Sequence, residues 1–151
     1  MKILISDNRQ RVRSAVGLLL EQQENCQVVE QAGDFAALLQ SLAAGCPDLI
    51  LLDWELEGFH PQKISLLNHQ CPQARIIALS SQPESRSRAL AAGVDGFVTK
   101  GDPPQKLLAA VAAAAEKAPR LEWTALPSFS EKAKSSQRKA KVEPCSENQI
   151  P

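Results

Sequence analysis

Short apolar runs alternate with longer amphipathic stretches through residues 1–118 of this 151-residue chain. The runs occupy residues 3–5, 28–29, 49–52, 76–79 and 96–98 and are predicted to be five strands. Apart from the second and the fifth they are continuously apolar, as strands covered on both faces of a sheet should be. The stretches between them repeat apolar residues at helical spacing, as Val12, Val16 and Leu19 do. Strict alternation of this kind predicts an α/β fold, a doubly wound parallel sheet of five strands with five helices and right-handed crossovers.

Capping signals mark several of the expected helix ends. Asp34 and Asp102 are expected to be the N-caps of the second and fifth helices. The third helix is expected to begin near Pro61 and the fourth at Pro83, with Gly93 just past the end of the fourth. These signals separate the helices from the loops that follow each strand.

Composition excludes several classes of protein. The charges balance, with 17 basic and 17 acidic residues, so we do not expect the whole chain to attract nucleic acid. No apolar run is long enough to span a bilayer, and the N-terminal sequence MKILISD turns polar too early for a signal peptide. We therefore expect a cytoplasmic protein without membrane contact.

The four cysteines are scattered along the chain, at Cys26, Cys46, Cys71 and Cys145, and they form no CxxC pair. Their spacing does not suggest a zinc site. In a cytoplasmic chain, such cysteines are typically free thiols with a structural role, and that is our expectation here.

Residues 119–151 differ in composition from the rest of the chain. They contain several prolines, a serine-rich middle and a basic run, with six basic and four acidic residues in all. Such a segment buries too little apolar surface to order itself, so we expect a disordered polar tail after a domain of residues 1–118. Two questions stay open: whether Trp123, Leu126 and Phe129 pack on the domain or bind a partner, and whether the basic run binds nucleic acid.

Polar side chains follow four of the five expected strands. They are Ser6, Asp7 and Asn8 after the first strand, Asp53 after the third, Ser80 and Ser81 after the fourth, and Thr99 and Lys100 after the fifth. Because functional sites of doubly wound sheets lie at the carboxyl ends of the strands, we expect these side chains to lie close together. One sheet edge then carries two carboxylates, an amide, several hydroxyls and an ammonium group.

This set of groups suits the transfer of a phosphoryl group to a carboxylate. Asp53 is the candidate nucleophile, and Lys100 is expected to neutralise phosphate oxygens. Asp7 and Asn8 are expected to help hold Mg²⁺, directly or through water, while Ser80 donates a hydrogen bond to the phosphoryl group. Each residue alone has a simpler explanation, such as a helix cap or a solvated charge, but their convergence favours the functional interpretation.

Four segments carry a resemblance to a known family: MKILISDN, PDLILLDWELEG, ARIIALSSQPE and AAGVDGFVTKGDPPQKLLAAV. Residues 1–117 resemble the receiver domain of two-component response regulators, especially those that usually carry a C-terminal LuxR-type helix-turn-helix. The resemblance implies a flavodoxin-like fold with strand order 2-1-3-4-5. It also implies phosphorylation of Asp53 by a sensor histidine kinase or a phosphotransfer protein.

The resemblance further implies a role for each residue at the sheet edge. The positions are Asp7 and Asn8 for the acidic pair, Asp53 and the backbone carbonyl of Glu55 for the rest of a Mg²⁺ site, Lys100 for the family's lysine, and Ser80 and Phe97 for the switch hydroxyl and the switch aromatic. Such a protein is not a conventional enzyme, although it assists its own phosphotransfer and dephosphorylation.

The sequence departs from the family pattern at several places. Asn8 stands where a second acid normally binds the metal, so Mg²⁺ is expected to bind weakly. Glu57 replaces a proline after the phosphoacceptor, and Pro61-Gln62 replaces the commoner Asp-Gly before the third helix. The tail also lacks the paired amphipathic helices that a DNA-binding output domain needs.

Two functions follow from these expectations. The first is a single-domain response regulator that signals through its fourth helix, fifth strand and fifth helix to a protein partner or to a second copy of itself. The alternative is a degenerate receiver that acts as a phosphorylation-independent interaction or dimerisation module. Asn8 favours the alternative, whereas Asp53, Ser80 and Lys100 favour the first function.

Overall fold

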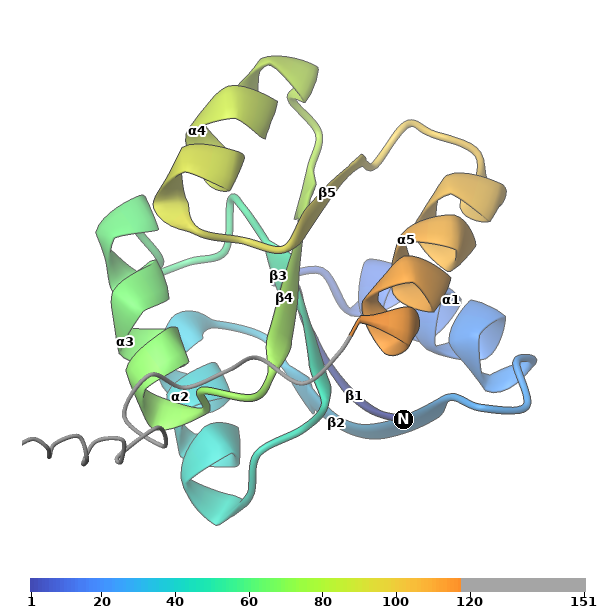
Figure 1. The fold of residues 1–151 in the computed structure, drawn as a ribbon, viewed down its shortest axis with the longest axis horizontal. Helices are drawn as coiled ribbons and strands as arrows, with labels where there is room; N and C mark the ends of the chain where they lie inside the picture. The colour runs from blue at the N-terminus through green and yellow to red at the C-terminus, as the bar shows by residue number, and fades with distance from the viewer. Residues whose placement is uncertain (118–151) are drawn as a thin grey trace, which may run out of the picture. The chain divides into compact units, whose positions relative to one another are not determined.

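The computed structural model describes residues 1–117. Five parallel strands form one sheet in the order β2-β1-β3-β4-β5, and helices alternate with them along the chain (Figure 1). The strands are β1 (Lys2–Ser6), β2 (Gln27–Ala32), β3 (Leu49–Asp53), β4 (Arg75–Ser80) and β5 (Gly96–Thr99), and the helices are α1 (Gln10–Glu21), α2 (Phe35–Ala44), α3 (Ile64–Gln70), α4 (Arg86–Ala92) and α5 (Pro104–Glu116). The flavodoxin-like fold, its strand order and its five helices are confirmed.

The helices cover both faces of the sheet. Figure 1 shows α1 and α5 on one face and α2, α3 and α4 on the other. Side chains of the central strand β3 alternate between the two cores, because Ile50 and Leu52 pack with residues of α2, α3 and α4, whereas Leu49 and Leu51 pack with those of α1 and α5. All four side chains are fully buried, which explains the continuously apolar sequence of this strand.

Four of the predicted helix ends are confirmed. Asp34 is the N-cap of α2, where its carboxylate accepts a hydrogen bond from the N–H of Ala37 at 2.7 Å. Gly93 adopts a left-handed φ of 109° directly after α4, a conformation that favours glycine. Short 3-10 turns at Pro61–Lys63 and Pro83–Ser85 lead into α3 and α4, at the prolines where those helices were expected to begin.

The prediction that Asp102 caps α5 was wrong. Pro103 is the N-cap of that helix, and the Asp102 carboxylate accepts instead from the N–H of Thr99 at 3.2 Å. The helix begins at Pro104, and neither proline has an N–H that a capping side chain could bind. The carboxylate therefore closes the loop between β5 and α5 instead of capping the helix.

Two of the cysteines form a disulfide, which corrects the expectation of free thiols. Cys46 and Cys71 are bonded, with their Cα atoms 5.7 Å apart. Cys46 is exposed in the loop before β3, and Cys71 is buried directly after α3. The fold brings them together across 25 residues of sequence, a proximity that no spacing motif signals. Cys26 is free, and Cys145 lies outside the described residues.

No helix within residues 1–117 is both long enough and apolar enough to cross a membrane. The expectations for the tail lie outside the described residues: the boundary at residue 118, the disorder of residues 119–151, and the role of Trp123, Leu126 and Phe129. They stay predictions.

Candidate functional site

Side chains from the carboxyl ends of four strands converge at one edge of the sheet. Asp7 follows β1, Asp53 ends β3, Ser80 ends β4 and Lys100 follows β5. Asp7 and Ser80 have no exposed surface, and Asp53 is 1% exposed. The parallel strand order produces this convergence, as the sequence predicted.

Lys100 joins the two buried carboxylates. Its Nζ lies 2.7 Å from Oδ2 of Asp7 and 3.0 Å from Oδ1 of Asp53. The backbone N–H of Lys100 also donates to the carbonyl of Ser80 at 2.7 Å, which fixes the start of the loop that carries the lysine. Without this ammonium group, two negative charges would lie close together in a site of low dielectric.

Asp53 is a carboxylate whose surroundings disfavour its charge. Burial raises the pKa of Asp53 above its usual value of 3.8. Hydrogen bonds from Lys100 and from the backbone N–H of Glu55, at 3.0 Å, offset only part of that effect. Ionised Asp53 is therefore stabilised by any further positive charge that reaches it.

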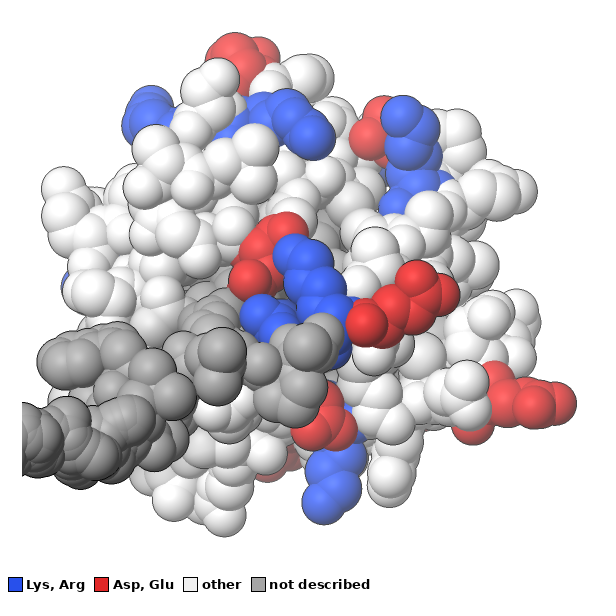
Figure 2. Space-filling model, viewed as in Figure 1, with Lys and Arg blue, Asp and Glu red and all other residues white. Residues whose placement is uncertain are grey.

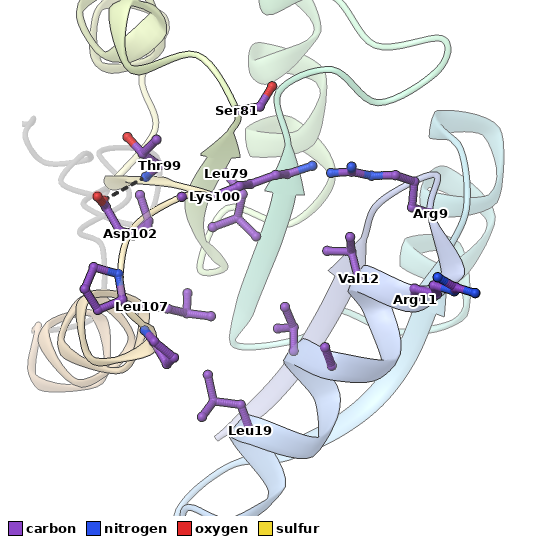
Figure 3. Close-up of a pocket in the computed structure, with 16 residues that line it drawn as sticks. Arg9, Arg11, Val12, Leu19, Leu79, Ser81, Thr99, Lys100, Asp102 and Leu107 are labelled. Carbon is purple, nitrogen blue, oxygen red and sulfur yellow. Dashed lines mark hydrogen bonds between the residues drawn. The ribbon is translucent and has the colours of Figure 1, made fainter.

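A second basic residue, Arg9, holds Asp7 from its other side. The backbone N–H of Arg9 donates to Oδ1 of Asp7 at 2.8 Å, and its Nε lies 3.7 Å from the same oxygen. In Figure 3 the side chains of Arg9 and Lys100 point toward one another from opposite sides of the site. Sequence reasoning missed Arg9, for which the available signal was a basic residue two positions after Asp7.

Asn8 is exposed on the loop directly after Asp7. Among residues 1–117, no group of three His, Cys, Asp or Glu side chains is placed to hold a metal ion. Asp7 and Asp53 are two buried acids at this edge, and both contact Lys100. Two carboxylates with neutral amide and carbonyl oxygens are ligands that Mg²⁺ accepts. The residues present therefore fit a Mg²⁺ site of reduced charge.

The hydroxyl of Ser80 donates to Oε2 of Glu55, at 2.5 Å, rather than to Asp53. The other carboxylate oxygen of Glu55 accepts from the N–H and the hydroxyl of Ser81, both at 3.2 Å. The sequence interpretation used only the backbone carbonyl of Glu55 and missed its side chain. The available signal was an acid two positions after Asp53, opposite a Ser-Ser pair on the neighbouring strand.

Phe97 lies in the core. It is 9% exposed and belongs to the cluster that contains Ala89 and Val94. The register of β4 and β5 pairs Phe97 with Ala78, two residues before Ser80. Phe97 thus packs beside the strand that ends at Ser80, the residue expected to be the switch hydroxyl.

A groove of about 810 Å³ opens between α1 and the segment that joins β5 to α5 (Figure 3). Apolar side chains of α1 and α5 line the groove, and Arg9, Arg11 and Lys100 supply its positive charges. Because Lys100 lines the groove and also contacts both carboxylates, the groove leads to the site.

Comparison with known proteins gives a family match. The model of the response regulator receiver domain matches residues 3–112. The oxygen regulatory protein NreC of Staphylococcus epidermidis is 29% identical over 115 residues, and the phosphate regulon transcriptional regulatory protein PhoB of Klebsiella pneumoniae is 34% identical over 117 residues. The match covers 74% of this chain in both cases but 53% and 50% of those proteins, so the chain spans about half the length of the curated relatives it matches.

Solved structures share the fold. The isolated REC domain of RcsB from Salmonella enterica serovar Typhimurium, in the presence of phosphomimetic BeF3−, matches with a TM-score of 0.72 at 25% identity, covering 82% of this chain and 94% of that one. The signal receiver domain of NarL from Mycobacterium tuberculosis matches with a TM-score of 0.67 at 26% identity, covering 77% and 97%. Sequence match, fold and site agree, and the chain belongs to the response regulator receiver domain family of two-component signal transduction.

Proposed function

We propose that this receiver accepts a phosphoryl group on Asp53 from a sensor histidine kinase or a phosphotransfer protein. The observation that carries the proposal is the contact of one ammonium group, Lys100 Nζ, with the buried carboxylates of Asp7 and Asp53. Receiver domains generally interact with histidine kinases or phosphotransfer proteins. A receiver of residues 1–118 and a location in the cytoplasm are parts of the same proposal.

The reaction needs little covalent chemistry from the protein. A carboxylate oxygen of Asp53 forms a bond to phosphorus while the bond between phosphorus and the donor's histidine nitrogen breaks. Lys100 neutralises charge on the phosphoryl oxygens, and Asp7 keeps the lysine in position at 2.7 Å. The groove presents Arg9 and Arg11 to the incoming donor, which favours the approach of an anionic group. The same residues are proposed to assist dephosphorylation of Asp53.

Receiver domains generally bind Mg²⁺ at the phosphorylation site. In this chain Asp7 and Asp53 would hold the ion through carboxylate oxygens, with the Asn8 amide and the backbone carbonyl of Glu55 as neutral ligands. When bound, Mg²⁺ neutralises charge on the carboxylates and on the phosphoryl group. We expect weak binding, because Asn8 contributes no charge.

The proposed output surface consists of α4, β5 and α5. Ser80 and Phe97 connect it to the site, since Ser80 ends β4 and Phe97 packs in one cluster with Ala89 of α4. Leu90 of α4 is 43% exposed and offers apolar contact to a protein partner or to a second copy. On the face drawn in Figure 2, basic and acidic side chains of the described residues lie interspersed, which favours a protein partner over nucleic acid.

A second candidate is a receiver that acts without phosphorylation, as an interaction or dimerisation module. Two observations favour it. Asn8 takes the place of a metal-binding acid, and Glu55 already engages the Ser80 hydroxyl in the unphosphorylated chain.

Incubation with acetyl phosphate and Mg²⁺, followed by intact-mass measurement, separates the two candidates. We expect the mass of the wild type to rise by one phosphoryl group, and that of Asp53→Asn to stay unchanged. Label on Asp53→Asn would refute the assigned acceptor. A wild type that takes no label from acetyl phosphate or from phosphorylated histidine kinases would support the phosphorylation-independent module.

A further inference from the structure

We propose that the Glu55 side chain is an internal competitor of the phosphoryl group. In the unphosphorylated chain its carboxylate occupies the donors of Ser80 and Ser81 that a phosphoryl group on Asp53 would bind. The inference rests on the proposed function, and it adds a residue that sets how readily the site accepts an anion.

The Glu55 carboxylate is held by a set of hydrogen bonds at the end of β4. Glu55 accepts three of them through two oxygens, from the Ser80 hydroxyl at 2.5 Å and from the N–H and hydroxyl of Ser81 at 3.2 Å. An anion held by several donors is the pattern of an anion-binding site, and such charge-assisted hydrogen bonds are stronger than neutral ones. The carboxylate thus fills a small anion site at the end of β4.

Asp53 lies beside the strand that ends in these donors. The register of β3 and β4 pairs Asp53 with Leu79, so the Ser80–Ser81 donors begin one residue further along the neighbouring strand. The loop after Asp53 is held against β4, because the N–H of Trp54 donates to the carbonyl of Leu79 at 2.7 Å. Glu55, in this loop, and a phosphoryl group on Asp53, at the end of β3, would therefore reach the same donors.

Electrostatic repulsion also opposes the presence of both anions at these donors. A phosphoryl group brings about two negative charges to a site where Glu55 already places one. The negative charges of Glu55 and of the phosphoryl group repel one another. The fully buried hydroxyl of Ser80 donates its one proton to one acceptor at a time. Phosphorylation must then displace the Glu55 carboxylate, which lowers the affinity of the site for an anion.

The test uses the full chain with Trp123→Phe, so that Trp54, next to Asp53, is the sole tryptophan and reports on the site. Beryllium fluoride is titrated in the presence of Mg²⁺ and followed by Trp54 fluorescence. We expect Glu55→Gln to bind it about tenfold more tightly than the unsubstituted background, because the competing charge is lost. Glu57→Gln is the matched control: Glu57, like Glu55, is an exposed acid of the loop after β3, so the variant removes the same charge, and we expect a change of about twofold or less.

Two further measurements separate a competitor from a merely structural residue. Without any added anion, the amide resonance of Ser81 should shift in Glu55→Gln and stay in place in Glu57→Gln. In a Ser80→Ala background, the gain from Glu55→Gln should shrink, because the contested hydroxyl is gone.

The outcomes distinguish this inference from the proposed function. If the background binds beryllium fluoride and Glu55→Gln binds it no more tightly, the competitor role is wrong and the phosphorylation site stands. An unmoved Ser81 amide in Glu55→Gln would also overturn the inference. If no variant binds beryllium fluoride or takes label from acetyl phosphate, the proposed function fails and the competitor role fails with it.

Discussion

The Nζ of Lys100 lies 2.7 Å from Oδ2 of Asp7, although 93 residues separate the two in sequence. The strands that precede them are not neighbours, since β3 and β4 lie between β1 and β5 in the sheet. The lysine therefore reaches across two strands to the far carboxylate and contacts Asp53 on the way. One side chain compensates the charge of both buried acids.

Removal of that compensation should destabilise the fold in a pH-dependent way. We expect Lys100→Met to lower the free energy of unfolding at pH 7 by about 3 kcal/mol, because the substitution removes the ammonium group that both buried carboxylates contact. The loss should shrink as the pH falls and Asp53, whose pKa burial raises, takes up its proton. Chemical denaturation at pH 7 and at pH 4.5 measures both effects. Lys106→Met, an exposed lysine on α5, is the control, and an equal loss in that variant would contradict the explanation.

The convergence of Asp7, Asp53 and Lys100 was predictable because it depends only on topology. Each apolar run ends in a polar residue, and each helical stretch returns the chain to the same end of the next strand. Once the strands are parallel, the residues that follow them share one edge of the sheet whatever their separation in sequence. The helix ends at Asp34 and Gly93 were predictable for a different reason: a helix cap involves only residues of adjacent turns, so a local sequence signal is sufficient.

The contacts that sequence reasoning missed depend on the paths of loops and on side-chain rotamers. Glu55 reaches Ser80 because the loop after β3 folds back along β4, and no periodic pattern encodes that path. Cys46 and Cys71 meet because two loops at the other end of the fold run close together. Asp102 looked like a helix cap, but consecutive prolines removed the N–H groups that it would have bound.

Substitution of Asp53 should stabilise the metal-free protein at neutral pH. The raised pKa means that folded Asp53 binds its proton more tightly than unfolded Asp53 does. Ionisation therefore costs stability above the folded-state pKa, and the cost vanishes as the pH falls to the usual value of 3.8. We expect Asp53→Asn to raise the Tm by several degrees at pH 7 in EDTA, with a difference from the wild type that closes toward pH 4. Thermal melts across that range test it, and a variant less stable than the wild type at pH 7 would show that the Lys100 contact outweighs burial.

The disulfide between Cys46 and Cys71 should contribute to stability when the protein is oxidised. A cross-link that closes 25 residues reduces the entropy of the unfolded chain, a contribution of roughly 3.5 kcal/mol in the chain-entropy model. Cys46→Ser tests it with little loss of packing, because Cys46 is exposed. Denaturation of the variant should match that of the reduced wild type, and Cys26→Ser should behave like the oxidised wild type. If reductant leaves the wild type unchanged, the bond does not form in solution.

Restoration of an acid at position 8 should strengthen Mg²⁺ binding. Asn8 follows Asp7 directly and offers an oxygen without charge, so Asp7 and Asp53 are the two carboxylates among the residues proposed to hold the metal. We expect Asn8→Asp to bind Mg²⁺ about tenfold more tightly, a gain of about 1.4 kcal/mol, and to be phosphorylated faster by acetyl phosphate. Isothermal titration measures the first effect and intact mass over time the second.

The same substitution should have a cost when the metal is absent. A third carboxylate beside Asp7 and Asp53 adds like-charge repulsion that Lys100 alone cannot balance, so metal-free Asn8→Asp should unfold at lower denaturant concentration than the wild type. With saturating Mg²⁺, Asn8→Asp should instead unfold at a higher denaturant concentration than the wild type, because the ion binds the folded state more tightly in the variant. Asn25→Asp adds the same charge to an exposed loop after α1 and should change neither Mg²⁺ affinity nor its effect on stability. If Asn8→Asp leaves Mg²⁺ affinity and phosphorylation rate unchanged, residue 8 does not contact the metal.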